Sequence, residues 1–507
     1  MTVSELNPTD VEIRSYGGWR RTRGIGLFGL GGTGTGVVIA TIVATLTAAS
    51  INLRLLVVFA PAATAVVVAA TLRRDGESLA EIGLRRGRWW WGTVRGYHRL
   101  RCGTVSESAG AWDLPGPLAA TRLLSAEDGL GGRFGLVWDQ RSGFLTATLK
   151  CTALSTWLVD GDQSDAWVSN WHAWLAGLGY EPTVAWVAVT VDSAPEPGST
   201  LTDYVAGRLD PEAPDYARWV MAELVRHSPA AAADVQTRVS ITFDPAASPD
   251  RLDDLADQAG EVSRLLTGMA SALAECGVGN IERAQDWELA GIVRTAFDPA
   301  ARGEVQHLHS AGQGADLLSW SEAGPTGHVE EWRQYTHDSG VSVVWGWHQA
   351  PRQRVTANVL ARLMTPGRFP KRVTLLYRPY SAADAAEQLE RQVNAASFRE
   401  AVRRAQGRDE TARDQADRAQ AVQAAREEAI GAGLVRVSCY VTVTVTDPAD
   451  LPSAVAEVEA RAGQSKIKLR RLAGSQLAGF CATLPAGVHP AHLATWQPWR
   501  RDKGARR

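Results

Sequence analysis

The strongest pattern along the chain is a pair of long uncharged, mostly apolar runs near the N-terminus. No charged residue occurs from Gly24 to Leu53, and a second such run extends from Leu55 to Leu72. A helix needs about 20 apolar residues to span a bilayer. Both runs reach or approach that length, and only Arg54 separates them. The pattern therefore predicts a transmembrane helical hairpin over 24–72.

A glycine-rich motif lies inside the first run. Gly29-Leu30-Gly31-Gly32-Thr33-Gly34 matches the G-x-G-x-x-G fingerprint of dinucleotide-binding folds. That fingerprint needs a preceding buried strand and an acid about 20 residues later. The preceding residues are cationic, and no acid occurs between Glu12 and Asp75. We therefore interpret Gly32 and Gly36 as a G-x-x-x-G helix-packing motif. A buried hairpin of a globular domain and a cleaved signal peptide are the alternatives.

The charges near the hairpin predict its orientation. Residues 1–101 contain 13 arginines and six acidic residues, and both flanks of the hairpin are cationic. The positive-inside rule then places both termini in the cytoplasm, so we expect a multi-pass protein of the inner (plasma) membrane. The segment 85–101 mixes three tryptophans with arginines. That mixture predicts contact with anionic lipid. Direct nucleic-acid binding is the less favoured alternative.

After the hairpin, alternating apolar and polar positions predict two α+β regions. In the first region we expect strands at 133–139, 144–151, 183–191 and 237–243, and helices at 166–180, around 199–227 and over 250–300. In the second region we expect strands at 341–348, 372–378, 435–445, 466–471 and 475–483, and helices at 381–430 and 449–462. This order favours antiparallel sandwich units of ferredoxin type. The predicted fold class is thus α+β: a transmembrane hairpin followed by cytoplasmic ferredoxin-like units.

The same patterns predict the domain boundaries. The segments are a cytoplasmic arm (1–23), the hairpin (24–72), a basic aromatic segment (73–128), two α+β domains (129–330 and 331–495) and a basic tail (496–507). The five cysteines are scattered and have no C-x-x-C spacing. This favours a reducing compartment and argues against a zinc site or a disulfide framework.

The lysines exclude one class of activity. Only five occur, and none follows a glycine. A P-loop requires Gly-Lys-Ser/Thr so that the lysine reaches the nucleotide phosphates. The sequence therefore predicts no conventional P-loop ATPase, and with the Rossmann context missing we expect neither ATP nor NAD to bind.

Other motifs carry weak chemical signals. His337-Asp338-Ser339 has the residue types of a catalytic triad but fits a turn. Asp160–Asp165 resembles the start of a calcium loop but fits a helix cap. Two histidine pairs, His307 with His309 and His489 with His492, lack a third metal ligand at a suitable spacing. The S-x-x-K match at 465–468 lacks the companion motifs of the enzymes that use it. We therefore predict no catalytic residue, no cofactor and no metal.

Four stretches carry a resemblance to a known family: DAWVSNWHAWLAGLGYEP (165–182), WRQYTHDSGVSVVWGWHQAPR (332–352), KRVTLLYRPYSAADAAEQLER (371–391) and VTVTDPADLPSAV (443–455). The chain resembles membrane proteins of high-GC Gram-positive bacteria that are encoded with conjugation-type (type IV) secretion genes. The resemblance implies a two-helix inner-membrane subunit joined to a region like the N-terminal, non-ATPase half of the large secretion ATPase.

The function implied by this resemblance is a non-enzymatic scaffold of a type IV-like secretion or conjugation machine. Its expected partners are a separate P-loop secretion ATPase, other subunits of the machine and further copies of the chain. Two alternatives stay open. One is a core subunit of a type VII secretion complex, and the other is a membrane-anchored enzyme using His337 or the acids at 160–165.

Overall fold

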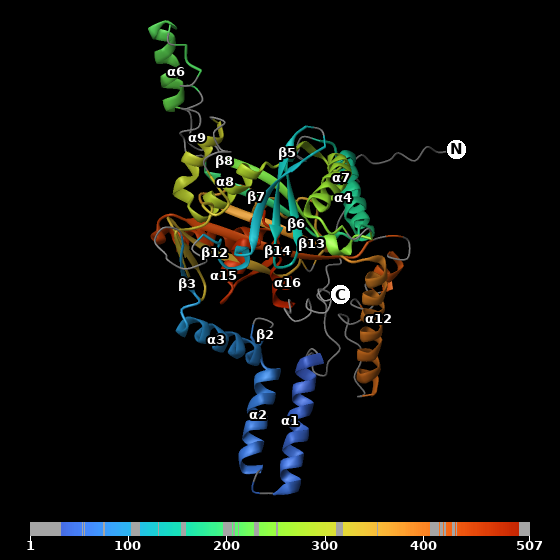
Figure 1. Cartoon of the computed structure of the whole chain (residues 1–507). Coiled ribbons are helices and arrows are strands. Elements are labelled where there is room, and N and C mark those ends of the chain that lie inside the picture. Colours follow the sequence, from blue (N-terminus) through green and yellow to red (C-terminus); the bar gives the residue numbers. More distant parts are fainter. Residues whose placement is uncertain are drawn as a thin grey trace, which may run out of the picture. The chain divides into compact units, whose positions relative to one another are not determined.

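The computed structural model divides the chain into two compact units, which are described separately (Figure 1). The smaller unit comprises residues 20–98 and 382–432, and the larger comprises 1–19, 99–381 and 433–507. The structure describes residues 32–52, 54, 56–74, 77–102, 112–129, 131–153, 159–195, 205, 208–210, 212–227, 233–249, 252–310, 318–351, 353–405, 415, 419, 422–427, 431 and 433–495.

The smaller unit contains two neighbouring apolar helices, α1 (Gly32–Ile51) and α2 (Leu56–Thr71). Threonines fit these helices because their hydroxyls donate to the carbonyl four residues earlier, as Thr45 does to Thr41 at 2.8 Å. Next come a two-stranded ribbon, β1 (Arg73–Arg74) with β2 (Glu77–Ser78), and helix α3 (Leu79–Val94), whose N-terminus is closed by a capping box. A distant segment contributes α12 (Ala382–Ala405).

These apolar helices correct the prediction of a membrane hairpin. Among the described residues, no helix is both long enough and apolar enough to cross a membrane. α2 has 16 residues, and at 1.5 Å per residue it extends roughly 24 Å, short of a hydrocarbon core of about 30 Å. α1 begins with glycine and threonine, so its apolar part, Val37 to Ile51, covers roughly 22 Å. The predicted transmembrane hairpin over 24–72 and the predicted multi-pass inner-membrane location, with both termini cytoplasmic, are therefore wrong.

Several predictions fall outside the described residues or are left untested. The arm 1–23, the first three residues of the glycine motif (29–31) and the tail 496–507 lie outside the described part of the chain. Trp90 and Trp91 are exposed on α3. The contact of this segment with anionic lipid stays a prediction.

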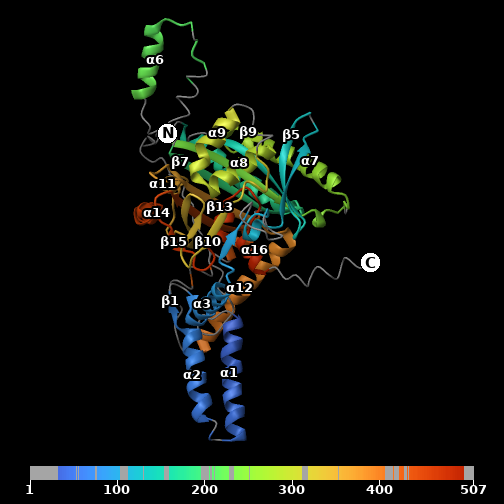
Figure 2. The ribbon, with the colours of Figure 1, turned by 60° about the vertical axis from the view of Figure 1, so that its left-hand side comes forward.

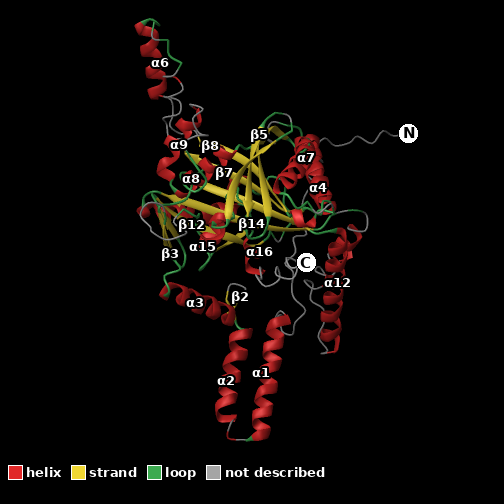
Figure 3. Cartoon of the chain, viewed as in Figure 1, coloured by secondary structure: helices red, strands yellow, loops and turns green. Residues whose placement is uncertain are grey.

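The larger unit is built on a 13-stranded sheet whose neighbouring strands are antiparallel (Figure 3). The order is β3-β10-β11-β12-β14-β13-β7-β8-β6-β5-β4, with β15 beside β12 and β9 beside β6. The strands are β3 (Arg99–Arg101), β4 (Thr121–Glu127), β5 (Arg133–Asp139), β6 (Phe144–Ala153), β7 (Val184–Pro195), β8 (Ala233–Phe243), β9 (Val278–Arg283), β10 (Gly327–Glu330), β11 (Tyr335–His337), β12 (Gly340–Gln349), β13 (Lys371–Pro379), β14 (Val435–Val445) and β15 (Lys468–Arg471).

Two groups of four strands repeat one connection within this sheet. The first group has the order β9-β6-β8-β7, and its helices are α4 (Gly161–Gly177) after β6 and α7 (Leu255–Ala274) after β8. The second has the order β15-β12-β14-β13, with α11 (Ala361–Met364) after β12 and α14 (Leu451–Gln464) after β14. Both follow β-α-β-β-α-β, and in both an extra helix lies between the second and third strands. These extra helices are α6 (Asp215–His227) and α12.

The continuous sheet corrects the predicted fold class in a second respect. We expected separate ferredoxin-like units after a membrane hairpin. Instead β7 and β13, the outer strand of each group, pair along their length from Val187 with Tyr377 to Ser193 with Lys371. An unpaired strand edge offers a row of free N–H and C=O groups, so joining two such edges satisfies both. One antiparallel sheet therefore extends through both predicted domains.

One face of the sheet carries the apolar side chains that the alternating pattern predicts. Under α4 and α7 lies a cluster that includes Leu149, Ile241 and Leu266, and under α14 lies a second cluster that includes Val373 and Val441. These side chains are almost fully buried. Their burial is the main apolar contribution to the stability of the large unit.

The opposite face is covered by α8 (Asp286–Phe297), α9 (Arg302–Ser310) and α15 (Gln476–Cys481). α8 and α9 lie side by side (Figure 2). A third apolar cluster, which includes Phe297 and Phe480, fills the space near α8 and α15. The predicted strand at 475–483 is thus wrong, because this segment forms α15 and packs its apolar residues against β12.

Most other predicted elements of this unit are present, with shifted ends. The predicted strands at 133–139 and 435–445 match β5 and β14, and the helix expected at 449–462 is α14. The expected helical stretch 250–300 is interrupted by the unpredicted strand β9. Of the long helix expected over 381–430, the described continuous part is α12.

The junction between β7 and β13 provides a stability test. The buried hydroxyls of Thr190 and Thr374 hydrogen-bond across it at 2.9 Å. Changing either one to Val leaves the other hydroxyl buried without this partner, so we expect each single variant to lose about 1–2 kcal/mol of unfolding free energy. In the double variant both polar groups are gone, and its loss should be at least about 1 kcal/mol smaller than the sum of the two single losses. Additive losses in urea unfolding would contradict the predicted coupling.

Candidate functional site

The second face of the central strands is polar although it is buried. Hydroxyl groups pair between neighbouring strands, Thr146 with Thr242 at 3.0 Å and Thr148 with Ser240 at 2.9 Å. Thr442 of β14 pairs with Thr483, in the turn after α15, at 3.2 Å. All of these side chains are buried. Because a buried polar group is costly without a hydrogen bond, this pairing makes the polar face compatible with the covering helices.

Charged residues occupy two adjacent rows of this polar face. In one row the strand register aligns Lys150 of β6, Arg238 of β8 and Thr190 of β7. In the next row it aligns Gln236, Asp192 and Arg372, from β8, β7 and β13. Since paired residues point to the same side of a sheet, these side chains meet on one surface.

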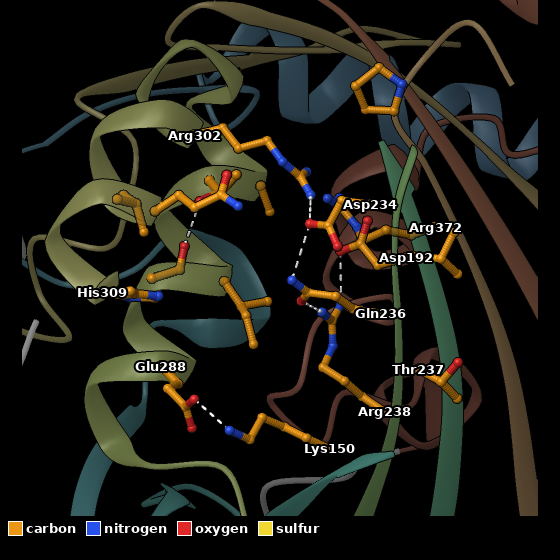
Figure 4. Close-up of a pocket in the computed structure, with 18 of the residues that line it drawn as sticks. Lys150, Asp192, Asp234, Gln236, Thr237, Arg238, Glu288, Arg302, His309 and Arg372 are labelled. Carbon is orange, nitrogen blue, oxygen red and sulfur yellow. Dashed lines mark hydrogen bonds and ion pairs between the residues drawn. The ribbon is translucent and has the colours of Figure 1, made fainter. Parts of the chain in front are cut away.

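A cavity of about 430 Å³ lies between these rows and the helices α8 and α9 (Figure 4). Its charged sheet wall is formed by Lys150, Asp192, Asp234, Arg238 and Arg372. The helix wall combines apolar side chains with polar ones: Ile292, Ala296 and Val305, and Glu288, Arg302 and His309. A concave space with a few convergent polar groups is the usual form of a small-molecule site.

Two ion pairs organise the centre of the cavity. Arg238 is only 2% exposed, and its Nη2 lies 2.9 Å from the Asp192 carboxylate. Arg302 reaches from α9 to Asp234 of β8 at 2.8 Å, as Figure 4 shows. Burial alone would raise the pKa of Asp192, but Arg238, Arg372 and Arg302 hold it below its usual range. Asp192 is therefore ionised at neutral pH.

A third ion-pair group closes one end of the cavity. Lys150 of β6 contacts Glu288 of α8 at 2.6 Å and Glu282 of β9 at 3.2 Å. Burial lowers the pKa of Lys150, yet the bonds and charges of Glu288 and Glu282 outweigh burial, so the net pKa is raised. Lys150 therefore stays protonated and ties α8 to the sheet.

His309 forms part of the helix wall near this end. Its ring packs edge-on against Trp287 with centroids 4.5 Å apart. Gly291 makes room for the ring, because a Cβ at this position would lie 2.6 Å from His309 Nε2. Burial lowers the pKa of His309, so the imidazole is neutral at pH 7. The sequence pair His307 and His309 is not joined by a third ligand, and no group of three metal-ligating side chains occurs in the described residues.

The triad-like motif does not assemble as a triad. His337 Nδ1 lies 2.6 Å from the Phe297 carbonyl, to which it donates, and Nε2 lies 2.8 Å from the Ser342 hydroxyl. Ser339 instead bonds Asp298, and Asp338 pairs with Arg294 at 3.0 Å. Burial lowers the pKa of His337 to about 3. His337 therefore links three segments of the fold as a neutral, hydrogen-bonded residue.

The remaining sequence candidates lie apart from the cavity lining. The 160–165 acids begin α4, where Asp160 is the N-cap residue but makes no side-chain cap bond. His489 and His492 pack against Trp186 with ring centroids 5.3 Å apart. Ser465 is buried in the turn before β15.

Sequence reasoning missed the cavity residues, although a signal was present. Four charged residues lie within otherwise mostly apolar strands, and their side chains point to the covered polar face of the sheet: Lys150, Asp192, Arg238 and Arg372. Charged residues are rarely buried unless they are paired. Such positions in strands expected to lie at the centre of a sheet indicate a charge cluster.

Comparison with known proteins adds no assignment. A scan of protein-family models found no match, and a search of curated proteins found no significant relative.

Histidine burial predicts a pH dependence of stability. The pKa of His337 is near 3 in the fold and about 6.5 in an unfolded chain. Between these values the unfolded state binds more protons, so stability falls as the pH decreases below about 6.5. His337 alone should remove about 2 kcal/mol between pH 7 and pH 5. Urea unfolding of His337→Asn should show a correspondingly smaller decrease of stability between pH 7 and pH 5 than the parent chain. An equal decrease in both proteins would contradict a buried, neutral His337.

Proposed function

We propose that the chain is a docking subunit of a type IV-like secretion or conjugation machine. In this role it binds a separate P-loop ATPase and contributes no nucleotide turnover of its own. The proposal is supported by the sequence resemblance, whose four stretches fall in α4, β11–β12, β13 with α12, and β14 with α14. The repeated strand groups contain α4, β12, β13, β14 and α14, whereas β11 pairs with β12 in the same sheet and α12 belongs to the smaller unit.

The observation that carries the proposal is the exposed aromatic face of α6. Tyr216, Trp219 and Leu224 are 75%, 57% and 60% exposed. They follow the i, i+3, i+8 spacing of one helix face, and the Tyr216 and Trp219 rings stack with centroids 5.9 Å apart. Water-exposed large aromatic and aliphatic side chains grouped in this way are typical of a protein interface, in which Trp and Tyr contribute most of the binding energy.

The position of α6 suits such a role. It is inserted between β7 and β8, two central strands of the sheet, and α12 occupies the corresponding insertion in the second strand group. The sequence of an insertion between two strands can vary without disrupting the sheet, so binding residues often lie on such insertions. A stable complex with an ATPase would bury roughly 1,200–2,000 Å² in total, so α6 would supply the apolar centre of a wider contact. Self-association of the chain is part of the same proposal.

A double substitution on α6 tests the docking proposal. Trp219→Ser with Leu224→Ser removes the centre of the exposed face while leaving the sheet core unchanged. We expect recovery of the P-loop secretion ATPase with the affinity-tagged chain, from cells that express the native machine, to fall at least tenfold. That loss corresponds to about 1.4 kcal/mol, a modest value for two interface anchors.

Tyr180→Ser is the matched control, because Tyr180 is 66% exposed and lies outside α6. It should recover the ATPase at the parent level. Parent-level recovery by the α6 variant would show that this face is not the interface. Failure of the parent chain itself to recover a secretion ATPase would refute the proposed function.

A further inference from the structure

Arg372 is the exception among the three arginines of the cavity lining. Arg238 and Arg302 each have a carboxylate partner, and Lys150 has two. None of the ion pairs found among the described residues involves Arg372. Its Nε donates to the Thr483 hydroxyl at 3.1 Å, and its guanidinium stacks 4.7 Å from the centre of the Phe480 ring. Arg372 is thus fixed in place and lacks a direct counter-ion.

Two guanidinium donors at this site have no acceptor. Arg372 Nη2 and Arg238 Nε each expose less than 1 Å² and make no hydrogen bond in the structure, so an acceptor in the cavity would reach them through a small shift of the arginine side chains. Their side chains are 7% and 2% exposed. A guanidinium has only donors, so the missing partner must be an acceptor. Leaving such donors unsatisfied is unfavourable, and a charged acceptor compensates more than a neutral one.

The surrounding geometry favours a tetrahedral anion. Arg238, Arg302 and Arg372 come from β8, α9 and β13 and approach the same region of the cavity from different directions (Figure 4). A planar carboxylate accepts mainly within one plane, whereas a phosphate accepts around a tetrahedron. Asp192 and Asp234 hold two of these guanidinium groups through single ion pairs, and Gln236 Oε1 accepts from Arg238 Nη1 at 3.3 Å. Since a guanidinium has five N–H donors, both groups keep further donors for a ligand.

The rest of the cavity indicates the size and character of the ligand. Its volume of about 430 Å³ exceeds what a free phosphate needs. Ile292, Ala296 and Val305 give the helix wall an apolar surface, and Gln236 and Thr295 add hydrogen-bonding groups. We propose that this cavity binds a small organic phosphate, with the phosphate at the three arginines and the body against α8 and α9. This site is separate from α6 and does not depend on the docking proposal.

The test uses isothermal titration calorimetry on the full chain with inorganic phosphate, and with acetate as a carboxylate probe. We expect phosphate to bind with a submillimolar Kd and acetate to bind at least tenfold more weakly. Arg302→Gln should weaken phosphate binding at least tenfold, and Arg372→Met should abolish the measurable heat. Arg122→Gln is the control, because it removes one positive charge from a surface ion pair with Asp113 outside the cavity lining. It should bind like the parent.

Asp234 also accepts a hydrogen bond from Gln236 Nε2 at 3.2 Å, so it keeps a partner when Arg302 is replaced and the Arg302→Gln chain should fold. If circular dichroism shows that Arg372→Met does not fold, Arg302→Gln decides the test alone. The proposal is overturned if the parent chain gives no phosphate binding, if Arg302→Gln binds phosphate as tightly as the parent, or if acetate binds as tightly as phosphate. Absence of phosphate binding by a parent chain that still recovers the ATPase would refute this site and leave the docking proposal intact.

Discussion

The large unit depends on one constraint, the burial of a polar sheet face. Both faces of the central strands are covered, one by α4, α7 and α14 and the other by α8, α9 and α15. The apolar face needs only close packing, whereas each hydroxyl or charge on the polar face needs a partner. Paired threonines and serines meet this requirement over most of the face, and ion pairs meet it near α8 and α9. The cavity lies where this pairing is incomplete.

This constraint also explains what the sequence could predict. The strand at 435–445 was predictable because its apolar positions alternate regularly, and the strand at 133–139 because a short apolar run precedes the turn at 140–143. The same alternation suggested that the opposite positions, including Thr442 and Thr444, face water, yet both are buried. Alternation reports the difference between two faces of a strand and gives no information on whether a helix covers the polar one. The cavity therefore had to be found from the three-dimensional pairing of strands distant in sequence.

The incorrect membrane prediction has a related cause. Counting uncharged residues treats the glycines and threonines at 31–36 as equivalent to valine or leucine, although they add little apolar surface. What decides a span is the apolar length within each helix, and here α1 ends at Ile51 and α2 begins at Leu56. The absence of charged residues marks the ends of an apolar segment, but it does not give the length of the apolar helix within that segment.

The two proposed sites are connected through the same pair of strands. β7 ends at Pro195 and β8 begins at Ala233, so the insertion that carries α6 leaves the sheet three residues after Asp192 and returns to it one residue before Asp234. Asp192 and Asp234 are the carboxylates that hold Arg238 and Arg302 in the cavity. The same strand ends therefore carry charged groups of one site and the chain connections of the other. Coupling between the two sites would require two arrangements of these strand ends that the docking partner and the cavity ligand distinguish, and each would then change the affinity of the other by the same factor.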